Sequence, residues 1–242
     1  MTEEPDDLAL YPAMSTYDRR HQNYRPKIVA DQRSRSITRR RSSDPRGTVI
    51  RAATMKYDRT VIAYHGCDAD TAERLLRGEP FRKSQNDYDW LGSGIYFWEY
   101  GADRALRFAH DQKARGKVET PAIVGALIQL GRCFDLMDTR FTEELPMAFE
   151  LFKKVHDHTG KPLPENRGKT PDRLLRHRDC AVLNFYLDRF SGGTESYDTV
   201  RCGFLEGPPA FEGSGIRHRS HVQIAVRTPA CVVGVFRPTI MS

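Results

Sequence analysis

Three short pieces of the chain carry residue types from which a ligand site is built. AYHG contains His65 and Gly66, GSGIYF contains Tyr96, and SHVQIAV contains Gln223. An imidazole and an amide offer hydrogen bonds, a tyrosine ring offers a flat face, and a glycine admits a ligand close to the backbone. These groups predict ligand binding, provided that the fold brings them to one place.

Acids and glycines lie directly before the third piece. The stretch RCGFLEGPPAFEGSGIRHRSHVQ, residues 201–223, contains Glu206 and Glu212 and is predicted to be a loop that leads into a strand. The five cysteines are odd in number and form no C-x-x-C pair, so they predict neither a disulfide framework nor a zinc site. Any chemistry is therefore expected to be metal-independent.

Period-two alternation predicts the strands that would position these pieces. In RTVIAYHG it places Val61 and Ala63 on one face and Ile62 and Tyr64 on the other, which is typical of a strand buried on both faces. In SGIYFW it turns Tyr96 away from the buried face. In SHVQIAV it turns the polar residues to a single face.

The remaining elements follow from helical spacing, capping residues and apolar runs. Helices are expected near residues 68–78, 102–115, 145–160 and 172–190, and further strands near residues 122–131 and 231–236. Strands dominate both ends of this region and helices interrupt them, which predicts an α+β domain with a split β-sheet and flanking helices.

Composition divides the chain into an arm and one folded domain. Residues 18–51 hold eleven Lys or Arg and three Asp, a net charge of +8, whereas the whole chain carries +6. Because this segment has few aliphatic side chains to bury, residues 1–54 are expected to form a disordered, arginine-rich arm. Residues 55–242 are long enough to bury one core and are expected to form the functional domain.

The cellular setting is predicted from what the chain lacks. No apolar run approaches the roughly 18 residues that span a bilayer, and the acidic N-terminus is unlike a signal peptide. A cytoplasmic, monomeric protein without membrane contact is expected.

The three pieces, in this order, resemble the ADP-ribosyltransferase superfamily, specifically its diphtheria-toxin-like and poly(ADP-ribose)-polymerase-like branch with a His-Tyr-acid triad. YHG and GSGIYF are similar to the first two nicotinamide-pocket strands of that branch, and VGALIQLGRCFDLMD to the strand and turn after its pocket helix. QIAVRTPACVVGVF matches the strand with the catalytic acid and the next strand. The resemblance runs from about Val61 to Phe236 and implies an ADP-ribosyltransferase-like split β-sheet sandwich.

Carried onto this sequence, the resemblance implies that NAD is the co-substrate and that its ADP-ribose is transferred. His65 would contact the adenosine ribose hydroxyl, and the backbone of Gly66 would hold the nicotinamide carboxamide. Tyr96 would stack on the nicotinamide ring, with Tyr64 or Tyr88 as a second wall. The loop that folds over the dinucleotide would be formed by Gly92, Ser93 and Gly94.

The chain departs from the family pattern at the catalytic acid, where Gln223 stands in place of the usual glutamate. A carboxylate about 4 Å from a developing positive charge stabilises it by roughly 4 kcal/mol at an effective dielectric constant near 20, about a thousandfold in rate. On one interpretation Gln223 serves for orientation, Glu206 or Glu212 supplies this charge or activates the acceptor, and mono-ADP-ribosylation is expected. On the other, the domain is a catalytically inactive module that binds NAD or nucleic acid.

The acceptor expected of a transferase is a macromolecule, namely RNA, DNA or protein. Residues 18–51 would capture nucleic acid through phosphate contacts, which raise affinity without giving sequence choice. Bacterial members of the superfamily are commonly toxins or defence effectors, and a compact single domain suits that role. A third interpretation, an RNA 2′-phosphotransferase of the same superfamily, requires basic residues around a 2′-phosphate that the sequence does not place.

Overall fold

The computed structural model describes residues 59–168, 173–189 and 196–239. The predicted arm, residues 1–54, lies outside the described residues and stays a prediction. None of the helices in the described ranges has the length and apolarity needed to cross a bilayer.

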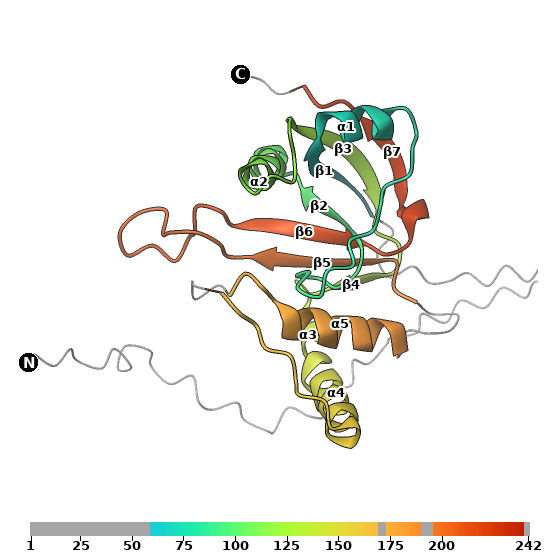
Figure 1. Cartoon of the computed structure of the whole chain (residues 1–242), viewed down its shortest axis with the longest axis vertical. Coiled ribbons are helices and arrows are strands. Elements are labelled where there is room, and N and C mark those ends of the chain that lie inside the picture. The colour runs from blue at the N-terminus through green and yellow to red at the C-terminus, as the bar shows by residue number, and fades with distance from the viewer. Residues whose placement is uncertain (1–58, 169–172, 190–195, 240–242) are drawn as a thin grey trace, which may run out of the picture. The chain divides into compact units, whose positions relative to one another are not determined.

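The described residues form a seven-stranded sheet with flanking helices, so the predicted α+β class is confirmed (Figure 1). The sheet order is β4-β5-β6-β2-β1-β3-β7, and its neighbours are antiparallel except for the parallel pair β4 and β5. The strands are β1 (Thr60–Asp68), β2 (Ile95–Glu99), β3 (Pro121–Gln129), β4 (Cys133–Asp135), β5 (Thr199–Phe204), β6 (His221–Val226) and β7 (Val232–Phe236). The helices are α1 (Ala69–Leu76), α2 (Ala102–Ala114), α3 (Thr139–Thr142), α4 (Leu145–Thr159) and α5 (His177–Arg189), with a 3₁₀ turn at Pro229–Cys231.

Apolar side chains pack on both faces of the sheet. One face buries a cluster that includes Phe97 and Ile224, and Phe81 packs against it. The opposite face buries Ala225 and Val200 against α4 and α5. Figure 1 shows α3, α4 and α5 gathered near the β4 end of the sheet, whereas α1 and α2 lie near β1 and β3. The helices therefore divide between the two ends of the sheet.

The contact between β1 and β2 is the shortest in the antiparallel part of the sheet. β1 pairs with β3 along all nine residues, but with β2 only through Ala63–Glu99 and Tyr64–Trp98. β1 therefore separates from β2 directly before His65. The sheet therefore opens within the first predicted piece, residues 63–66.

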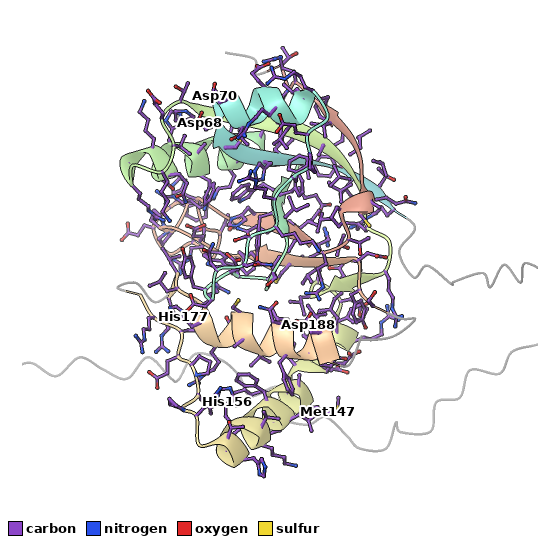
Figure 2. The ribbon with its side chains drawn as sticks, turned by 45° about the vertical axis from the view of Figure 1, so that its right-hand side comes forward. Asp68, Asp70, Met147, His156, His177 and Asp188 are labelled. Carbon is purple, nitrogen blue, oxygen red and sulfur yellow. The ribbon has the colours of Figure 1, made fainter. Side chains whose placement is uncertain are left out.

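Local signals place several elements as predicted. Asp68 accepts a hydrogen bond from the N–H of Asp70 and so caps α1, and Figure 2 shows both side chains there. Gly160 ends α4 in the left-handed conformation, with φ of 64°. Helix α2 and strand β3 agree with the predicted ranges to within two residues.

Three expectations are corrected. Ile62 is 37% exposed, so β1 is not buried on both faces. The helix predicted near residues 172–190 begins at His177, because the side chain of Asn166 accepts the N–H groups of Arg178 and Asp179 and caps α5 from a distant segment. The stretch at residues 201–223 is not all loop before its last strand, because its first four residues belong to β5.

Candidate functional site

His65 lies at the opening between β1 and β2. Its Nδ1 is 2.8 Å from the carbonyl oxygen of Tyr96, and because a carbonyl only accepts, Nδ1 carries the hydrogen. The ring packs against Phe81 and Phe97, with centroids 5.5 and 5.7 Å away. Burial lowers the pKa of His65, while the bond to Tyr96 acts in the opposite direction. The imidazole is thus neutral at pH 7 and presents an acceptor at Nε2.

Gly66 admits a helix rather than a ligand on its side-chain face. A Cβ at this position would lie 2.2 Å from the carbonyl oxygen of Ala105 in α2, a separation that no side chain tolerates. The predicted contact between the Gly66 backbone and a carboxamide stays a prediction. Tyr64, two residues before Gly66, points to the same face of the sheet as Trp98. Its ring meets the ring of Phe236 edge-on, with centroids 6.3 Å apart.

Tyr96 positions the glycine-rich loop. Its hydroxyl donates to the carbonyl oxygen of Gly92 at 2.7 Å and accepts from the N–H of Leu91 at 2.8 Å. Burial raises the pKa of Tyr96 well above its ordinary value. The ring packs beside the apolar cluster under α4 and α5. The predicted stacking partner of a ligand therefore also has a structural task, which is to hold residues 91 and 92.

The rest of this loop is fixed against its neighbours. The Oδ1 of Asn184 in α5 accepts from the N–H of Ser93 at 2.8 Å and lies 2.5 Å from the position of a Cβ on Gly92, whose φ is +73°. Gly94 exchanges two backbone hydrogen bonds with Ser84. Tyr88 lies earlier in the same loop, edge-on to His177 at 5.9 Å. In this conformation Gly92 allows close packing with α5, and Gly94 allows close packing with Ala225 of β6.

Gln223 belongs to a chain of hydrogen bonds at the start of β6. His221 Nδ1 lies 2.6 Å from the carbonyl oxygen of Arg219, so it carries the hydrogen, and Nε2 must accept. The partner of Nε2, 2.9 Å away, is the amide nitrogen of Gln223. Burial is the main cause that lowers the pKa of His221. This chain fixes the orientation of the amide, and the Gln223 carbonyl oxygen has no hydrogen-bond partner among the described residues.

Glu206 joins this chain, and Glu212 does not. The carboxylate of Glu206 is buried and lies 2.7 Å from Nη2 of Arg104 and 3.8 Å from Nδ1 of His221. Arg104 comes from α2, and its guanidinium lies over the ring of Trp98 at 5.6 Å. Glu212 is exposed on the connection between β5 and β6, which projects beyond the strands in Figure 1.

The predicted triad spans both faces of the sheet. Tyr64, Trp98 and Gln223 form one row across β1, β2 and β6, so the backbones at 64 and 223 lie about 10 Å apart, two strand spacings. Since side chains alternate, His65 points to one face, whereas Tyr96 and Gln223 point to the other. The expectation that these three side chains line one crevice is corrected: the structure brings them to one place in the sheet but does not turn them into a single hollow.

Sequence reasoning missed Arg104, and it left open whether Trp98 lines a pocket or packs in the core and whether His221 is structural. Arg104 and Glu206 are 102 residues apart, so no local pattern announces their ion pair. Two buried donors, Nε of Arg104 and Nε1 of Trp98, have no hydrogen-bond partner among the described residues. A buried arginine beside an unpartnered indole is a signal that only the structure provides. No cluster of three or more His, Cys, Asp or Glu in the described ranges is arranged to hold a metal ion.

Comparisons with known proteins supply a relative but no activity. No protein-family model matches the chain, and no solved structure matches it. A search of curated proteins matches the uncharacterized protein MJ0359 of Methanocaldococcus jannaschii. The two are 29% identical over 157 residues, which cover 62% of this chain and 67% of that protein.

Proposed function

We propose that this chain is an NAD-dependent mono-ADP-ribosyltransferase with an ADP-ribosyltransferase-like split sheet. The observation that carries the proposal is the arrangement around the opening of the sheet. A neutral His65 is fixed where β1 leaves β2, and Gln223 is fixed two strands away by His221, which lies 3.8 Å from the buried carboxylate of Glu206. These are the hydrogen-bonding and charged groups that the cleavage of a glycosidic bond requires.

The reaction breaks the bond between nicotinamide and the ribose C1′, and the bonding electron pair leaves with nicotinamide. His65 presents an acceptor at Nε2, which suits a ribose hydroxyl. Gln223 presents its carbonyl oxygen, which suits the 2′-hydroxyl of the reacting ribose. Because the side chains of His65 and Gln223 face opposite sides of the sheet, NAD must pass through the opening between β1 and β2 to contact both. The acceptor contributes the electron pair of the new bond to C1′ and releases one proton.

Glu206 provides the negative charge that Gln223 lacks. Its carboxylate lies 3.8 Å from His221, which in turn contacts Gln223. Because Arg104 pairs with Glu206 at 2.7 Å, much of this charge is compensated. We therefore propose slow transfer of single ADP-ribose groups rather than growth of chains. Glu212 is too exposed to contribute charge at Gln223 in this conformation.

The acceptor we propose is a macromolecule, either nucleic acid or protein, modified by a monomer in the cytoplasm. The net charge of +8 on residues 18–51 supports nucleic acid, because phosphate contacts by basic side chains raise affinity without base choice. A role as a toxin or defence effector is consistent with such an acceptor.

Transfer of label from [³²P]NAD to pools of RNA, DNA and protein tests the proposal. We expect one pool to gain label, and we expect His65→Ala to lower the rate at least a hundredfold. His158→Ala changes an exposed histidine of α4 and serves as the matched control, with an unchanged rate. Equal labelling by wild type and His65→Ala would contradict the assignment of His65.

A second candidate is supported by the glutamine itself. A domain with Gln223 in place of a carboxylate retains groups for binding NAD or nucleic acid but lacks the full charge for turnover. The Gln223→Glu variant separates the two candidates. NAD hydrolysis that is absent in the wild type and strong in the variant favours the inactive binding module, whereas turnover by the wild type favours the transferase.

A further inference from the structure

A cavity of about 340 Å³ lies between β5, α4 and α5. Most of its lining is apolar and includes Leu136, Leu145, Phe149, Val182, Leu183 and Phe204. Its volume lies within the range of small-molecule sites, roughly 300–1,000 Å³. It is separate from the chain of Gln223, His221 and Glu206, none of which lines it.

Arg176 is a charged group of this cavity that two aromatic rings hold in place. Its guanidinium lies over the rings of Trp90 and Phe204, at 4.2 and 4.9 Å from their centroids. Its Nε is buried and has no hydrogen-bond partner among the described residues. A buried N–H without an acceptor is unfavourable, so a ligand that delivers an acceptor to Arg176 would restore the missing bond.

The charged groups of the cavity leave a net positive charge. Arg178 donates from Nε to the carbonyl oxygen of Pro164, and its guanidinium lies 5.9 Å from the ring of Phe149. Asp179 lies 3.8 Å from Arg176 and also accepts from the amide of Asn166 at 2.8 Å. One carboxylate therefore faces two guanidinium groups, which favours an anion.

We propose that this cavity binds a small molecule with an aromatic body and a single anionic group. The body fills the apolar space between β5, α4 and α5, and the anion accepts hydrogen bonds from Arg176. Trp90 forms a wall of the cavity, and its ring also stacks on His221, with centroids 6.1 Å apart. The ring of Trp90 thus separates a bound molecule from His221, which belongs to the hydrogen-bond chain of Gln223. The proposal does not rest on transferase activity.

Two fluorescent probes with the same rings test this inference. They are 1-anilinonaphthalene-8-sulfonate and the uncharged N-phenyl-1-naphthylamine, titrated into the full chain. We expect one equivalent of each probe to bind, the sulfonate at least tenfold more tightly. Arg176→Gln should remove that preference and leave the affinity for the uncharged probe within twofold.

A pair of variants on α4 locates the bound probe. Leu145→Trp puts an indole into the cavity and should weaken both probes at least tenfold. Met147→Trp adds the same ring at a position that is 55% exposed and that Figure 2 shows on α4, and it should leave both affinities unchanged. Circular dichroism establishes that each variant is folded.

Three results would overturn the inference. These are the absence of saturable binding, equal affinity for the two probes, and an undiminished preference for the sulfonate in Arg176→Gln. Equal effects of Leu145→Trp and Met147→Trp would place the probe elsewhere and also count against it. If Leu145→Trp does not fold, the comparison of the two probes in Arg176→Gln decides the question alone.

Discussion

The Gln223→Glu substitution probes the hydrogen-bond chain of β6 directly. In the wild type the Gln223 amide nitrogen lies 2.9 Å from Nε2 of His221, which accepts its hydrogen. Burial lowers the pKa of His221, so the imidazole is neutral at pH 7. An ionised carboxylate has no hydrogen to donate. In the variant, His221 must therefore take a proton on Nε2 to keep the contact.

The size of the effect follows from the separation of the two charges. Unit charges 4 Å apart attract by about 4 kcal/mol at an effective dielectric constant near 20. One pKa unit corresponds to about 1.4 kcal/mol, so the new carboxylate should raise the pKa of His221 by roughly 3 units. The titration midpoint of His221 is then predicted to lie roughly 3 units higher in the variant than in the wild type.

NMR titration of the imidazole Cε1–H signals between pH 5 and 9 measures this change. The protein has eight histidines, and the signal that disappears in His221→Asn identifies the one of interest. Gln223→Met is the matched control, because methionine has a similar size and does not introduce the negative charge of glutamate. It should leave the titration midpoint of His221 below 6.5. A rise of less than one unit in Gln223→Glu would refute the proposed contact.

Three further predictions concern the free energy of unfolding, measured with urea. Because burial lowers the pKa of His65 and of His221, the unfolded state binds more protons than the folded state below pH 6.5. The free energy of unfolding should therefore decrease as the pH falls below 6.5, by up to about 1.4 kcal/mol per pH unit for each histidine. His65→Gln should remove the contribution of His65 to this slope. Gly66→Ala should cost at least about 2 kcal/mol, since its Cβ would meet the carbonyl of α2, whereas Gly215→Ala, with open space around it, should cost under about 0.5 kcal/mol. Tyr96→Phe should cost about 1–3 kcal/mol through the loss of two hydrogen bonds to the loop, and Tyr100→Phe at an exposed position should be near neutral; equal costs for either pair would count against these contacts.

The sequence predicted the parts of the fold that local signals determine. Asp68 caps α1 and Gly160 ends α4 because each acts through its own neighbours in the chain. The start of α5 was predicted about five residues too early, because its cap comes from Asn166, outside the helical pattern. β5 was missed because its apolar alternation is short and its burial depends on pairing with β6.

The site shows the same division between local and distant information. Alternation separated Tyr96 from Ile95 and Phe97, and the structure agrees. The expectation that Tyr96 turns away from the buried face was wrong, because the cluster under α4 and α5 covers that face as well. Alternation along β1 also turns His65 to the face opposite Tyr96. This could not be predicted from β1 alone, because it depends on the register between β1 and β2. The pairing of Glu206 with Arg104 joins segments 102 residues apart, which no spacing rule connects.

Titration of the protein with NAD, followed by the same NMR signals of the histidines, tests the central claim most directly. If NAD binds at the opening between β1 and β2, the Cε1–H signals of His65 and His221 shift together and saturate with one equivalent. The signals of His156 and His158, on the distant helix α4, stay in place. Unmoved His65 and His221 signals at millimolar NAD, in a folded protein, would contradict the proposed NAD site.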